Sequence, residues 1–122
     1  MAIGTKRLVV GAHYGLRDWL VQRLTALILA IYTVFFLIYL FITVRIAGGF
    51  SYDQWAAMFA PAWMKVLTLT AIFALLYHAW IGMRDVWMDY VRATGLRLGL
   101  LLLTILWLFF CAIWAAQILW SV

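Results

Sequence analysis

The residue with the clearest chemical potential in this sequence is a histidine inside an apolar segment. His78 lies six residues before Arg84, and therefore about 9 Å from it along a helix that rises 1.5 Å per residue. Ionisable side chains at such depth in an apolar segment are rare and are functional candidates by default. Three roles stay open: a hydrogen bond between helices, a proton relay, or ligation of a metal by the neutral imidazole.

Among metal centres, a haem suits a single histidine better than zinc does. Zinc needs three or four ligands, and the segment offers no cysteine or second histidine near His78. A haem supplies four nitrogens itself and takes only axial ligands from protein. One histidine can then serve if a partner chain supplies the other ligand. The remaining histidine, His13, is expected to be an ordinary solvated side chain.

One stripe of the predicted helix around His78 consists mainly of small and acidic residues. At 100° per residue, it covers positions within about 40° of the histidine direction. Small residues let a neighbouring helix approach closely, and they also leave space for a flat cofactor. The stripe contains Ala71, Ala74, His78, Gly82, Asp85 and Asp89.

A second candidate site lies where this apolar segment ends. Asp89 and Tyr90 stand there among the cations Arg84 and Arg92. In one interpretation they form a salt bridge at the membrane rim beside an interfacial tyrosine. In the other, the tyrosine hydroxyl donates a hydrogen bond to the carbonyl of a lipophilic head group, and the nearby cations favour the reduced form of that head group. Arg23, at the start of the first apolar segment, is either a membrane-orienting cation or a partner for a cofactor carboxylate.

The composition defines the elements that must position these residues. Of 122 residues, 70% are apolar and 11% charged, whereas soluble domains have roughly 45–50% and about 25%. A small water-soluble core cannot bury such an excess. This excludes a soluble enzyme, a nucleic-acid-binding module and a disordered tail, so the partners are membrane lipid and other membrane proteins rather than nucleic acid.

Three uncharged runs predict an all-α integral membrane protein with three transmembrane helices. They cover about 24–44, 66–83 and 98–120, close to the roughly 20 residues that a spanning helix needs. In hydrocarbon the backbone must be hydrogen-bonded within each segment, which favours helices. We expect a single membrane-anchor domain over 1–122, with a basic arm over 1–23. The aromatic connection 45–65 suits the headgroup layer, and Cys111 has no disulfide partner in the chain.

The basic residues predict the orientation. Four Lys and Arg residues lie in the arm and three in the connection 84–97, which makes seven against two in the connection 45–65. Basic residues are enriched on the cytoplasmic side. The N-terminus is therefore expected in the cytoplasm and the C-terminus on the outer side, as in a multi-pass protein of a bacterial inner (cytoplasmic) membrane.

The segment HAWIGMRDVWMDYVR resembles the signature of the small hydrophobic (D-type) anchor subunits of succinate dehydrogenase, respiratory complex II. That family has a histidine, ten residues and then Asp-Tyr, with a glycine one turn after the histidine. A second similarity is an Arg-x-Thr-Ala segment that opens the first span. One departure is Arg17-Asp18, where some bacterial members have His-Asp, so no role of that histidine is carried over. The matching positions are His78, Gly82, Asp89, Tyr90, Arg23, Thr25 and Ala26.

The resemblance implies a cofactor site shared between two chains. A second three-helix cytochrome b anchor subunit would hold a haem b together with this chain, and His78 would be one axial ligand of the haem iron. Tyr90 would hydrogen-bond ubiquinone with support from Asp89. Arg23 would lie near a haem propionate or the quinone.

The resemblance also implies a larger complex. An iron–sulfur subunit and a flavoprotein subunit would dock on the cytoplasmic side. Succinate oxidation there would feed electrons to ubiquinone, which links the tricarboxylic acid cycle to the respiratory chain. The chain by itself is expected to be a non-catalytic anchor within that succinate:quinone oxidoreductase.

Three other interpretations remain. A fumarate reductase anchor has the same architecture and works in the opposite direction. A small transporter subunit would use His78 in a proton relay, although the three spans contain no Asp or Glu to share the proton. In a purely structural anchor, His78 and Tyr90 would only pack.

Overall fold

The computed structural model describes the backbone from Ala2 to Val122 and the side chains from Gly15 onward. The side chains of His13 and of the basic residues Lys6 and Arg7 lie outside that part. The described chain is helical and follows the order α1 (Ala2–Ala47), α2 (Tyr52–Phe59), α3 (Ala62–Tyr90) and α4 (Thr94–Trp120).

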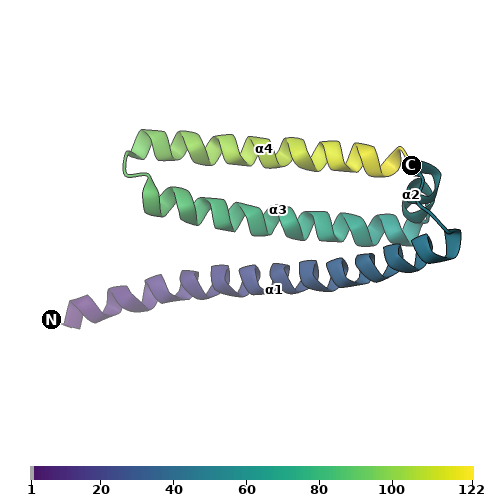
Figure 1. The fold of residues 1–122 in the computed structure, drawn as a ribbon. Helices are drawn as coiled ribbons and strands as arrows, with labels where there is room; N and C mark the ends of the chain where they lie inside the picture. Colours follow the sequence, from purple (N-terminus) through teal and green to yellow (C-terminus); the bar gives the residue numbers. More distant parts are fainter. Residues whose placement is uncertain (1) are drawn as a thin grey trace.

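The three long helices lie side by side, and α3 stands between α1 and α4 (Figure 1). The chain reverses direction after each long helix, so neighbouring long helices are antiparallel. The short helix α2 covers the end at which α1 finishes and α3 begins, and the C-terminus lies near it. Residues of the first and second predicted spans therefore face each other along α1 and α3.

The prediction of three spanning helices is confirmed. Three helical stretches are long and apolar enough to cross a membrane: Gly15–Ala47, Ala62–Tyr90 and Thr94–Trp120. Each extends beyond the uncharged run that predicted it, because backbone hydrogen bonding continues into the headgroup region where charged side chains reach water. The orientation of the two ends stays a prediction from charge.

The aromatic connection between the first two spans contains a helix of its own. The Ser51 hydroxyl accepts from the Gln54 backbone N–H, and the Gln54 side chain accepts from the Ser51 N–H, which forms a capping box at the start of α2. Gly48 has φ of +70°, a conformation that glycine adopts without steric cost. Pro61 then precedes α3 in an extended conformation.

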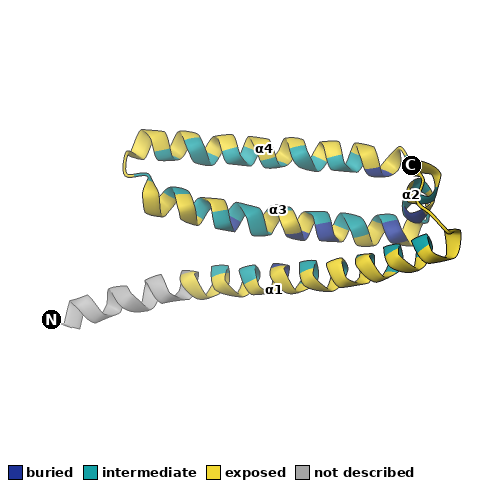
Figure 2. Ribbon diagram, in the orientation of Figure 1, coloured by how far each residue is buried: buried dark blue, intermediate teal, exposed yellow. Residues whose placement is uncertain are grey.

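Few side chains are buried within the described part of the chain, and most of those lie on α3, the central helix (Figure 2). Large apolar side chains are exposed along α1 and α4. In water such surfaces would drive aggregation, whereas in a membrane they face lipid or other subunits. The buried hydrophobic residues are Met58, Met64, Ala71, Ala74, Ile81 and Leu119.

Candidate functional site

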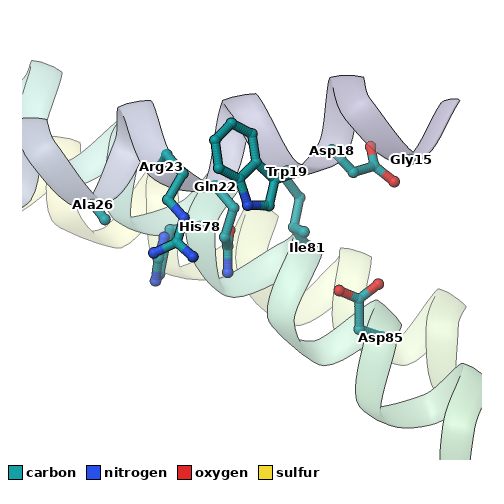
Figure 3. A pocket seen from close by; sticks show the side chains of 9 residues that line it. All are labelled: Gly15, Asp18, Trp19, Gln22, Arg23, Ala26, His78, Ile81 and Asp85. Carbon is teal, nitrogen blue, oxygen red and sulfur yellow. The ribbon is translucent and has the colours of Figure 1, made fainter. Parts of the chain in front are cut away.

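A hollow of about 520 Å³ opens between α1 and α3, on the side of the bundle away from α2. His78 of α3 and Arg23 of α1 both line it, so the structure brings together two of the residues singled out by the sequence (Figure 3). Its lining combines a histidine, an arginine, an amide and two carboxylates with apolar surface. The lining residues are Gly15, Asp18, Trp19, Gln22, Arg23, Ala26, His78, Ile81 and Asp85.

A hydrogen bond to the facing helix fixes one side of the His78 imidazole. Its Nδ1 lies 3.0 Å from Oγ1 of Thr25 on α1. Thr25 is buried, at 7% exposed, while His78 lines the hollow. The second ring nitrogen, Nε2, therefore remains as the one available to a ligand.

The small residues of the stripe are partly covered, and Gly82 approaches α1. Ala71 and Ala74 are both buried. A Cβ added at Gly82 would have one neighbour within 4 Å, the Gln22 Nε2 of α1 at 3.9 Å, which is ordinary contact. Packing within this chain therefore does not require glycine at position 82, and space remains next to His78.

The hollow has a buried acceptor without a partner. Gln22 Oε1 is buried and makes no hydrogen bond in the described part of the chain. Such atoms are uncommon in folded proteins, and a missing ligand is one of their explanations. Gln22 was not predicted from the sequence, where the only signal is a polar amide one residue before Arg23, at the start of an apolar run.

Charged side chains connect the same ends of α1 and α3. Arg84 donates a hydrogen bond to the Asp18 carboxylate, and its Nε lies 3.9 Å from Oδ1 of Asp85. Arg23 stands over the ring of Trp19, with 5.5 Å between the guanidinium carbon and the ring centroid. Arg23 has no carboxylate partner among the described residues, and it is the cation that remains available at the hollow.

Asp89 and Tyr90 lie apart from the hollow, at the C-terminal end of α3. Both are exposed, Tyr90 at 80%. Tyr90 lies twelve positions after His78, which corresponds to about 18 Å along the axis, and it follows the last lining residue of α3, Asp85. The tyrosine hydroxyl makes no hydrogen bond within the described chain, so it is open to a ligand or partner at the membrane surface.

The donor set fits a haem better than a metal ion held by protein alone. No cluster of three or more His, Cys, Asp or Glu residues occurs in the described part of the chain, whereas a protein-held zinc needs three or four ligands. Haem iron takes only axial ligands from protein. The hollow offers one imidazole nitrogen, the Arg23 cation for a carboxylate and the partnerless Gln22 oxygen, and this combination fits one face of such a group.

Together, fold and site define an integral membrane protein of three spanning helices with a polar hollow between α1 and α3. The sequence profile of the succinate dehydrogenase/fumarate reductase transmembrane subunits matches residues 2–112. The chain belongs to this family, which confirms the resemblance carried by the motif from His78 to Arg92.

A curated relative agrees with this assignment. The succinate dehydrogenase hydrophobic membrane anchor subunit of Coxiella burnetii (strain RSA 493 / Nine Mile phase I) is 45% identical over 106 residues, which cover 87% of this chain and 89% of the relative. With its three apolar helices, the chain is a multi-pass protein of the type found in bacterial inner membranes.

Proposed function

We propose that this chain anchors succinate dehydrogenase in the membrane, supplies one axial ligand to a shared haem b and forms part of the ubiquinone site. The anchor role follows from the family and from the relative, which is similar over most of its length. The family description also includes fumarate reductase, whereas the relative is named as a succinate dehydrogenase subunit. The name of the relative favours succinate oxidation over fumarate reduction as the direction of the reaction.

The observation that carries the haem proposal is the position of His78 in the wall of the hollow, with Nδ1 bound to Thr25. In this proposal Nε2 would hold the iron of a haem, and Arg23 would pair with a propionate carboxylate. A bound haem would accept and release one electron at a time. This chain's own contribution is to orient the imidazole, to place a cation at the cofactor and to keep one face of the site apolar.

The site is proposed to be completed by a second three-helix cytochrome b anchor subunit. This chain offers one imidazole at the hollow, so a haem held by two imidazoles would need the second from another chain. Large apolar side chains also remain exposed along the described helices, especially α4, and part of that surface would be covered by such a subunit. An iron–sulfur subunit and a flavoprotein subunit would dock on the side of Asp89 and Tyr90.

Tyr90 is proposed as the hydrogen-bond donor to a ubiquinone carbonyl, with Asp89 supporting it. The exposure of the hydroxyl at the end of α3 supports this role, because a quinone head group would lie at the same level as an interfacial tyrosine. In this proposal the quinone would bind beyond the hollow, past Asp85, which is its last lining residue on α3. The rest of the quinone pocket would come from other subunits.

The test is an absorption spectrum of the purified complex with its subunits identified, for wild type and His78→Ala. The account predicts a haem b spectrum in the wild type that is lost or strongly altered in His78→Ala. Leu75→Ala, a change at an exposed position of the same helix, is the matched control and should keep the wild-type spectrum. An unchanged spectrum in an assembled His78→Ala complex would contradict the ligand assignment.

A further inference from the structure

Thr25 is the one polar residue that is buried in the described part of the chain. Its Oγ1 lies close to three polar atoms. Two are carbonyl oxygens of its own helix, Val21 O at 2.9 Å and Gln22 O at 3.1 Å, and the third is His78 Nδ1 at 3.0 Å. A hydroxyl has one proton to donate and two lone pairs to accept with.

The proton positions follow from these distances. Carbonyl oxygens can only accept, so two oxygen–oxygen contacts of this length require the Thr25 proton to lie between Oγ1 and the carbonyls. The lone pair that faces His78 must then receive a proton from Nδ1. The arrangement selects the tautomer with a proton on Nδ1, and the Nε2 of that tautomer carries the free lone pair.

We propose that Thr25 is a positioning residue: its hydroxyl holds His78 in the Nδ1–H tautomer, directs Nε2 into the hollow and tunes the potential of the haem bound there. This inference rests on the proposed function of His78. Ligating histidines commonly donate their other N–H to an oxygen acceptor, which fixes the ring and strengthens it as a donor. Here a threonine hydroxyl, oriented by its own helix backbone, is the acceptor.

Other threonines of the chain provide the comparison. Thr43 of α1 donates to Tyr39 O at 2.9 Å, the same bond one helix turn back that Thr25 makes to Val21. Thr68 of α3 shares a hydrogen bond with Tyr32 of α1 at 2.8 Å, and so links the same two helices. Neither contacts His78. If the haem potential responds to the loss of any threonine hydroxyl, or of any hydrogen bond between α1 and α3, substitutions at Thr43 and Thr68 would therefore change it too.

The experiment measures the midpoint potential of the haem by optical redox titration of the complete purified complex, with haem content measured in parallel. Thr25→Val keeps the shape and removes the acceptor. A weaker imidazole donor stabilises the ferric state less, so the potential should rise. We expect a roughly threefold change in the ratio of reduced to oxidised haem, or about 28 mV at 59 mV per tenfold for one electron, together with lower haem content.

The control variants isolate the hydroxyl next to His78. Thr25→Ser keeps the acceptor and should restore the wild-type potential. Thr43→Val and Thr68→Val should leave the potential unchanged. If the complex with Thr25→Val does not assemble, Thr25→Ala removes the same hydroxyl without putting a methyl group in its place. The same rise of the midpoint potential is expected.

Three results would contradict the account in different ways. A wild-type potential in both Thr25→Val and Thr25→Ala, with haem lost in His78→Ala, would overturn the positioning role and leave the ligand assignment intact. An equal rise in Thr68→Val would also overturn it, because helix contact alone would then set the potential. Haem retained unchanged in His78→Ala would overturn the proposed function itself.

Discussion

The two ends of the α1–α3 pair are held together by different kinds of contact. At the end near the hollow, polar groups connect the helices: Thr25 with His78, and Asp18 with Arg84. At the end near α2, the contacts are mainly between aromatic rings. Trp55 packs at 5.0–5.8 Å between centroids against Phe59 and Phe36, and further rings of the same region extend this cluster.

Most of the described polar contacts between α1 and α3 therefore lie at the end that contains the hollow. Polar and ionisable side chains inside a membrane are costly and mark functional paths, whereas aromatic rings at the interface anchor and pack. The polar end retains a hollow and a partnerless Gln22 oxygen, and the aromatic end is filled by its own rings. Substitutions at the polar end should change redox chemistry, and those at the aromatic end should change stability.

The largest effect is expected from Tyr90→Phe at the polar end. Loss of the hydroxyl removes the proposed hydrogen bond to ubiquinone and should lower the rate of quinone reduction roughly tenfold or more. Succinate oxidation by an artificial soluble acceptor should stay unchanged, because that route bypasses the anchor. Tyr77→Phe, an exposed tyrosine of the same helix, is the control. An equal fall of both activities in Tyr90→Phe would rule out the quinone role.

Trp55→Ala tests the aromatic end. It removes the ring from contacts with three neighbours, Phe36, Phe50 and Phe59, and aromatic pairs contribute about 0.5–1.5 kcal/mol each beyond their buried area. We expect the thermal stability of the detergent-solubilised complex to fall, by about 1.5 kcal/mol in unfolding free energy, with an unchanged haem spectrum. A shifted haem potential without lost stability would contradict the view that the two ends of the α1–α3 pair have different roles.

Arg23→Gln should affect the haem in the direction opposite to Thr25→Val. Removing a cation that faces the hollow favours the ferric state, which carries one more positive charge, so the midpoint potential should fall. Haem content should also decrease if Arg23 pairs with a propionate. Arg17→Gln, an exposed arginine of α1 that does not line the hollow, is the matched control. Equal shifts of the midpoint potential in both variants would show that Arg23 acts only as a distant surface charge.

Ser51→Ala gives the smallest effect. It removes the hydroxyl that caps α2 through the Gln54 N–H, and such caps contribute about 0.5–2 kcal/mol, near the low end when exposed as here. Thermal unfolding of the complex should show a small loss, and Ser51→Asp, another good capping residue, should restore stability. Wild-type stability in Ser51→Ala would show that packing alone holds α2.

Hydropathy and charge were sufficient for the fold but not for where the helices end. The uncharged runs predicted three spanning helices, and the structure contains them. However, α3 continues past the charged pair Arg84-Asp85 to Tyr90, whereas the apolar run ended near Met83. Hydropathy reports which segment prefers hydrocarbon, and helix ends depend on backbone hydrogen bonds and on residues that cannot continue the helix.

His78 and Arg23 of the site could be found from the sequence, but Gln22 and most of the pairings between helices could not. His78 was predicted because a lone ionisable residue in an apolar run needs a reason, and its stripe of small residues indicated a close helix. Thr25 lies 53 residues away from it, and Asp18 lies 66 residues from Arg84. Such pairs depend on the rotation and vertical offset of two packed helices, which no local pattern defines.

Chemical rescue of a cavity variant tests the central claim most directly. His78→Gly removes the imidazole and leaves space in which free imidazole can bind. We expect the purified His78→Gly complex to lack the wild-type haem spectrum and added imidazole to restore it, while wild type does not respond. A wild-type haem spectrum in His78→Gly without imidazole would show that another group holds the iron.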